Sequence, residues 1–168
     1  IIEQRQRVVS ASAPAVSTIF TGIGGARGWF SMNWAWGLRG FADRLIGGVG
    51  VRRGRRDPDR LRVGDALDFW RVEAVEPERL LRLRAEMIVP GKAWLQFQVA
   101  DRDDGMAVLT QTAFFAPRGL FGWAYWYALY PFHKFIFDGL IDQIKLRAER
   151  LAPPTAAERR ATEADARR

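Results

Sequence analysis

The chain has 168 residues, 48% of them hydrophobic, which suits one domain with its own apolar core. It contains no cysteine, which excludes disulfide bonds, thiolate metal sites and cysteine nucleophiles and is consistent with a cytoplasmic location. Lys and Arg outnumber Asp and Glu by 26 to 19, but basic and aromatic residues interleave only sparsely, so nucleic-acid binding is not indicated.

The first part of the chain predicts one strand and two helices. Residues 2–11 alternate as a strand does, and Ser12 followed by Ala-Pro is typical of a helix start. We therefore expect a short helix over residues 14–20, ended by a cluster of glycines. Residues 33–46 predict an amphipathic helix, because their apolar side chains recur at helical spacing. These apolar residues are Trp34, Leu38, Phe41, Leu45 and Ile46.

The middle of the chain changes to a period of two, which predicts strands. Four candidates follow one another: residues 65–75, 80–89, 92–99 and 106–116. A Pro-Gly turn separates the second from the third, and a DRDDG loop separates the third from the fourth. Strands joined by such short turns pair antiparallel.

Residues 119–150 are strongly helical but contain Pro131, which indicates either a kinked helix or a second helix beginning there. The aromatic side chains of this segment lie on most sides of the expected helix, so other parts of the structure or a partner should cover it on more than one side. The sheet would cover one side, and a partner domain, a second copy of the chain or a membrane surface the other. The face expected to be apolar carries Trp123, Trp126, Tyr130, Phe137, Leu140, Ile141 and Ile144. We expect a domain over residues 1–151 and a polar tail over 152–168.

This order of elements resembles the START-like (SRPBCC, helix-grip) superfamily, an α+β fold in which a curved antiparallel sheet wraps a long C-terminal helix and leaves a cavity between them. Several blocks are also similar to a bacterial domain-of-unknown-function family found C-terminal to atypical short-chain dehydrogenase (NAD-dependent epimerase-like) domains. These blocks are GGARGW at 24–29, LIGGVG at 45–50, RRGRRDP at 52–58, VGD at 63–65, DFWRV at 68–72, LTQTA at 109–113, PRG at 117–119, YWY at 125–127 and PFH at 131–133.

The resemblance implies an N-terminal Rossmann domain in the parent chain, which would be an NAD(P)-dependent oxidoreductase, and no cofactor in this domain. Tyr130 and Lys134 match the Tyr-x-x-x-Lys pair of short-chain dehydrogenases, and the glycines after Thr21 match their fingerprint loosely. However, there is no βαβ repeat, and the last serine of the chain is Ser31. We therefore assign no catalytic residue to this domain.

In the helix-grip interpretation the cavity holds a small apolar or lipid-like ligand. The concave wall would be formed by Leu81, Leu83, Met87, Leu95, Phe97, Leu109 and Phe115, with the last helix as a lid. Gln111 is in phase with this wall, where it either orients the ligand or reaches a backbone group or a water. The candidate ligand-binding residues are Leu83, Met87, Phe97, Gln111, Phe115, Trp126, Tyr130 and His133.

Two other functions stay open at this point. One is an enzyme of the cyclase or hydratase type, in which His133, Glu86, Tyr130 or Gln111 would act in the cavity. The other is an interaction or dimerisation module that uses the surplus aromatic residues. A lone histidine without a neighbouring carboxylate or cysteine at ligand spacing does not predict a metal site.

The loop over residues 51–60 is the strongest cluster of positive charge. It carries four candidate anion-binding residues, Arg52, Arg53, Arg55 and Arg56. They would bind a phosphate or an anionic lipid head if their side chains converged. The alternative is a solvated loop whose arginines pair with Asp57, Asp59 and Asp65.

Overall fold

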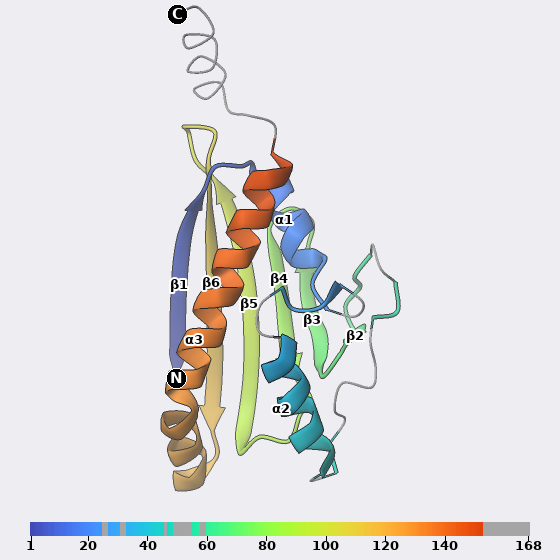
Figure 1. The fold of residues 1–168 in the computed structure, drawn as a ribbon, viewed down its shortest axis with the longest axis vertical. Helices are drawn as coiled ribbons and strands as arrows, with labels where there is room; N and C mark the ends of the chain where they lie inside the picture. The colour runs from blue at the N-terminus through green and yellow to red at the C-terminus, as the bar shows by residue number, and fades with distance from the viewer. Residues whose placement is uncertain (25–26, 31–32, 46, 49–54, 58–59, 153–168) are drawn as a thin grey trace, which may run out of the picture.

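The computed structural model describes residues 1–24, 27–30, 33–45, 47–48, 55–57 and 60–152. Within these residues, six strands form one antiparallel sheet in the order β1-β6-β5-β4-β3-β2, and a long helix lies along one face of it (Figure 1). This is the predicted α+β helix-grip arrangement. The elements are β1 (Ile2–Val9), α1 (Ala13–Thr21), α2 (Asn33–Leu45), β2 (Ala66–Leu67), β3 (Trp70–Glu76), β4 (Leu80–Ala85), β5 (Gly91–Asp101), β6 (Ala107–Pro117) and α3 (Gly119–Leu151).

The predicted strand over 65–75 is two strands, because the backbone turns at Asp68. Asp68 has a positive φ of 53°, which a strand does not tolerate, and its buried carboxylate accepts a hydrogen bond of 2.8 Å from Trp29 Nε1. Asp is one of the residue types that adopt this left-handed conformation most readily. The sequence pattern shows the alternation on both sides of Asp68 but not the turn between them.

The C-terminal segment is one helix of 33 residues that passes through Pro131. Its buried residues include Trp126, Phe137, Leu140 and Ile144, as expected, but Trp123 and Tyr130 are 45% and 40% exposed. The prediction that these two belong to the apolar face was therefore wrong. None of the helices within the described part of the chain is long and apolar enough to cross a membrane.

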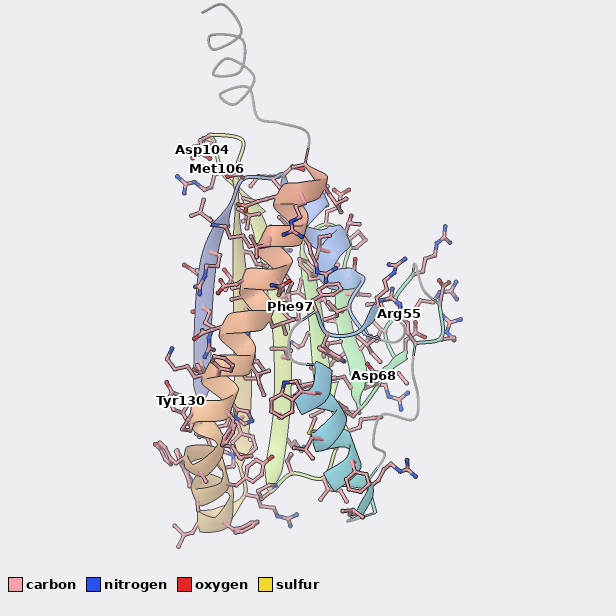
Figure 2. The ribbon with its side chains drawn as sticks, viewed as in Figure 1. Arg55, Asp68, Phe97, Asp104, Met106 and Tyr130 are labelled. Atoms are coloured by element: carbon pink, nitrogen blue, oxygen red, sulfur yellow. The ribbon has the colours of Figure 1, made fainter. Side chains whose placement is uncertain are left out.

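A closed core occupies the half of the sheet that lies beneath α1 and the C-terminal half of α3. The ring of Phe20 from α1 stacks on that of Phe97 from β5, with ring centroids 5.9 Å apart, and Figure 2 shows Phe97 near the middle of the sheet. The leucines of this half are fully buried, and a typical buried leucine contributes about 1.5–3 kcal/mol to stability. They are Leu81, Leu83, Leu95 and Leu109.

Ion pairs attach α3 to the edge strand β1, whose inward side chains Glu3, Arg5 and Arg7 are charged. Arg5 pairs with Asp138, and Arg7 pairs with Asp142 at 2.7 Å. Burial disfavours the charged form of Asp138, but hydrogen bonds from Lys134 and Arg5 outweigh it, so the pKa of this carboxyl lies below its ordinary value. These pairs fix how far the helix stands from the sheet edge.

The first turn of α3 is held at the other end of the sheet by a close contact. A Cβ on Gly122 would lie 2.5 Å from the carbonyl oxygen of Pro90 and 2.9 Å from Cβ of Pro117, so only glycine fits without a shift. The backbone N–H of Arg118 donates to the same Pro90 oxygen at 2.9 Å. The turn between β4 and β5 thus sets where the N-terminal half of α3 crosses the sheet.

Candidate ligand pocket

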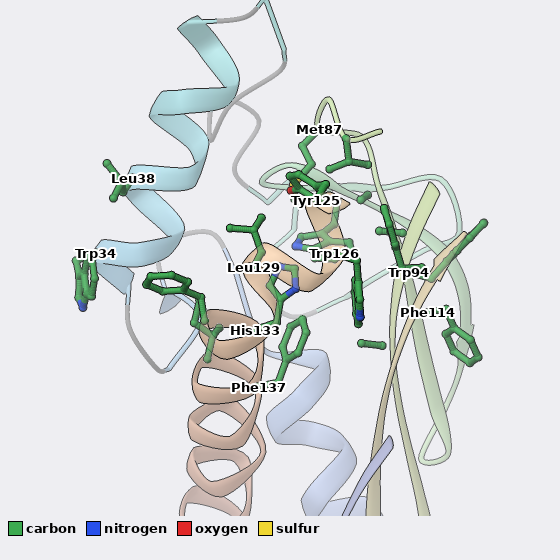
Figure 3. A pocket seen from close by; sticks show the side chains of 18 residues that line it. Trp34, Leu38, Met87, Trp94, Phe114, Tyr125, Trp126, Leu129, His133 and Phe137 are labelled. Carbon is green, nitrogen blue, oxygen red and sulfur yellow. The ribbon is translucent and has the colours of Figure 1, made fainter. Parts of the chain in front are cut away.

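A pocket of about 320 Å³ lies between the sheet and the N-terminal half of α3, with α2 at its edge (Figure 3). Trp126, Leu129, His133 and Phe137 contribute from α3, and Figure 3 shows them grouped beside the strands. The sheet contributes Trp70, Ala85, Ala93, Ala113 and Phe115, and α2 contributes Trp34 and Leu38.

The pocket forms here because the sheet carries alanines where the closed core carries leucines. Ala113 pairs in register with Leu95, and Ala93 with Phe115, so small side chains alternate with large ones across the strands. The helix α1 has only nine residues and covers the other half of the sheet. No side chain of α1 therefore fills the space above these alanines.

A series of stacked rings forms the helix side of the pocket. Phe115 stacks on Trp126 with ring centroids 5.3 Å apart, Trp126 meets His133 at 5.3 Å, and His133 stacks on Phe137 at 5.6 Å. These rings give the pocket a polarisable, aromatic lining. His133, one of the candidate ligand-binding residues, lines the pocket.

Few polar groups interrupt this apolar lining. The imidazole of His133 is one. Trp70 also lines the pocket, but it is 4% exposed, and its Nε1 has no hydrogen-bond acceptor among the described residues. A buried donor left unpaired costs about 1–3 kcal/mol. Because this Nε1 atom is itself buried, the indole of Trp70 meets the pocket through its carbon atoms.

Residues 2–140 match a family whose description is Protein of unknown function (DUF2867). The chain belongs to the DUF2867 family. No curated protein matches it.

Solved structures share the fold of this DUF2867 domain at low sequence identity. A Thermobifida fusca protein solved by NMR has a TM-score of 0.55 at 15% identity, covering 89% of this chain and 94% of its own. Truncated norcoclaurine synthase from Thalictrum flavum has a TM-score of 0.54 at 13% identity, covering 86% of this chain and 91% of its own. At such identities the likeness establishes the helix-grip fold and nothing about activity.

Half of the residues expected to contact a ligand lie in the pocket wall. These are Met87, Phe115, Trp126 and His133. The other four do not line it. Leu83 and Phe97 lie in the closed core, and Tyr130 is 40% exposed outside the pocket.

Gln111 is fully buried behind the pocket wall. Its Nε2 donates to the backbone oxygen of Phe137 at 3.2 Å, so it does reach a backbone group. Its Oε1 has no partner among the described residues. The period-two alternation of β6 predicted correctly that Gln111 lies on the inner face of the sheet. The same alternation puts Ala113 on that face, but Ala113 was not among the candidate ligand-binding residues.

The four residues considered for an enzymatic cavity do not converge. Both carboxylate oxygens of Glu86 accept hydrogen bonds from Arg71 at 2.9 Å, and Tyr130 lies outside the pocket that His133 lines. Among the described residues no group of three or more His, Cys, Asp or Glu could hold a metal ion. The pocket therefore offers binding surfaces rather than a set of paired acids and bases.

The arginine loop is described only in part, since Arg52 and Arg53 lie outside the described residues. Arg55 donates to the backbone oxygens of Thr21 at 2.6 Å and Ile23 at 3.1 Å, which ties the loop to the end of α1. Arg56 pairs with Asp65 at 3.0 Å, and this hydrogen bond is the main reason that the pKa of Asp65 lies below its ordinary value. Anion binding by this loop stays a prediction.

Proposed function

We propose that this domain binds a small, largely aromatic molecule that carries one hydrogen-bonding oxygen. The volume of about 320 Å³ is near the lower end of the roughly 300–1,000 Å³ of small-molecule sites, which suits a ligand of one or two fused rings. Stacked rings on the helix side and alanines on the sheet side form a slot for a flat, apolar group.

The observation that carries the proposal is the composition of the lining. Aromatic and aliphatic side chains make up nearly all of it, and His133 and Tyr125 are among the few lining residues that carry polar atoms. An apolar wall with a few convergent polar atoms is the usual composition of a ligand site, because the apolar surface supplies affinity and the polar atoms fix orientation.

The test compares naphthalene with 1-naphthol as probes, followed by quenching of the intrinsic tryptophan fluorescence. Both should bind, and 1-naphthol should bind about fivefold more tightly, as expected for one neutral hydrogen bond of about 1 kcal/mol. The variant Ala113→Leu should lose both probes, because leucine fills the pocket. The control Ala100→Leu, at an exposed position of β5, should bind both as the unaltered chain does.

A second variant tests the polar part of the proposal. In His133→Phe the ring stack is kept and the imidazole is removed, so the preference for 1-naphthol should shrink while naphthalene still binds. Equal binding of both probes to Ala113→Leu and Ala100→Leu would show that the probes bind elsewhere.

The domain would act as an auxiliary ligand-binding part of a short-chain dehydrogenase-like protein. The sequence blocks from GGARGW to PFH support this, because they resemble domains that follow a nucleotide-binding domain. An antibody against this chain should detect, in cells of its source, a polypeptide larger by the mass of a Rossmann domain. A band at the mass of the present chain would contradict this role.

A further inference from the structure

Exposed apolar side chains lie on α2 and on the N-terminal half of α3, the two helices that border the pocket. On α2 the stripe Trp34, Leu38, Phe41 and Leu45 is exposed by 59% to 72% of each residue's surface, although apolar stripes of this kind usually face a core. Trp34 and Leu38 also line the pocket, so the stripe continues into its mouth.

The N-terminal half of α3 extends the same surface. Leu120 and Phe121 are 89% and 73% exposed, and Tyr127, Phe132 and Phe135 are exposed as well. Phe132 also lines the pocket and so joins this half of α3 to its mouth. Figure 1 shows α2 and the beginning of α3 on the same face and at the same end of the sheet. We call these exposed residues of α2 and α3 the aromatic rim.

Charge at this end of the molecule is positive. The sequence has no Asp or Glu from Met87 to Ala100 or from Gly119 to Phe137, and Lys92 and Arg118 are exposed at the adjoining ends of β5 and β6. Glu86, directly after β4, is paired with Arg71, and α2 carries Asp43 together with Arg39 and Arg44. The carboxylates of the β5–β6 hairpin lie at the opposite end, where Figure 2 labels Asp104, far from Tyr130.

We propose that the aromatic rim docks on the surface of an anionic lipid membrane. Trp, Tyr and Phe side chains beside an excess of Lys and Arg are the chemistry that enters the headgroup region of such a surface. No described helix can span the membrane, so the attachment is peripheral, with the pocket mouth facing the lipid. A second copy fits less well, since a two-fold interface through the rim would place two surfaces of the same positive charge against each other.

The test is cosedimentation with vesicles of phosphatidylcholine that either contain or lack phosphatidylserine. The chain should bind the anionic vesicles, and salt should weaken the binding because it screens the charges. Two matched pairs of variants, each comparing the start of α3 with its end, locate the contact. Leu120→Ser should lower the affinity about tenfold, as expected for a leucine withdrawn from the interface, whereas Leu151→Ser at the far end should leave it unchanged. Arg118→Gln should lower it about fivefold, and Arg150→Gln should not.

Equal losses in both members of each pair would overturn the proposal, as would binding that does not depend on phosphatidylserine. Concentration-dependent dimerisation abolished by Leu120→Ser would also overturn it, because a second copy would then occupy the rim. All four positions are exposed, so the variants should keep the circular dichroism spectrum of the unaltered chain. The assay contains no pocket ligand, so its failure would leave the proposed ligand binding standing.

Discussion

Replacing Ala113 by leucine should stabilise this DUF2867 domain, because the new side chain enters the pocket. Leucine adds three carbon atoms, and at about 0.8 kcal/mol for each buried group the gain is roughly 2.4 kcal/mol. Restricting the leucine side chain costs about 0.5–1 kcal/mol, which leaves a net gain of about 1.5 kcal/mol.

The matched control is Ala107→Leu. Ala107 lies on the same strand, β6, and is fully buried in the closed core. There no space is left for the added atoms, and overpacking costs about 1–3 kcal/mol. Urea unfolding followed by tryptophan fluorescence should therefore separate the two midpoints by roughly 1.5 M, for an m-value of about 2 kcal/mol/M. If Ala113→Leu lost as much stability as Ala107→Leu, the space above Ala113 would be filled and the reasoning refuted.

Three further predictions concern the frame around the pocket. Asp138→Asn should lower stability at neutral pH and make stability depend less on pH in the acid range. The pKa of Asp138 is lower in the folded than in the unfolded state, so its carboxylate stabilises the fold above the unfolded pKa and loses this effect as the pH falls through the folded pKa. Urea midpoints measured at several pH values would follow this loss. Gly122→Ala should cost about 1–3 kcal/mol and weaken 1-naphthol binding, because its Cβ would displace the start of α3. Gly37→Ala, whose Cβ meets nothing within 4 Å, should instead gain up to about 1 kcal/mol, and equal effects in a urea titration would contradict the contact. Asp68→Ala should cost about 2–4 kcal/mol by thermal unfolding, since it removes the acceptor of the Trp29 Nε1 hydrogen bond and places alanine at a positive φ. A loss of stability below about 0.5 kcal/mol would refute the role of Asp68 in holding this turn.

The fold could be predicted from the sequence because its signals are local. Period-two alternation with short turns over residues 80–116 gives antiparallel neighbours, and the apolar segment after Gly119 gives the long helix. Asp68 broke one predicted strand because its left-handed conformation depends on a contact with Trp29, 39 residues away in sequence. A pattern of apolar and polar positions cannot contain that contact.

The sequence could predict which face of the sheet carries the candidate site, but not where along the strands the site lies. Phase alone placed Phe115 and Gln111 on the inner side, but Phe97 on the same face is in the closed core. The difference arises from the length of α1, which brings Phe20 onto Phe97 and reaches no further. The inward charges of β1 are a second example, because Arg5 is buried among Asp138, Glu3 and the ring of Phe137, which no local pattern brings together.

The most direct test of the central claim is a crystal structure determined under xenon pressure. Xenon enters apolar cavities that are empty and large enough to hold it. We predict a xenon site bounded by Ala113, Trp126 and Phe137, and its disappearance in Ala113→Leu. A structure in which side chains fill this volume and no xenon binds would contradict the pocket and the ligand binding proposed from it.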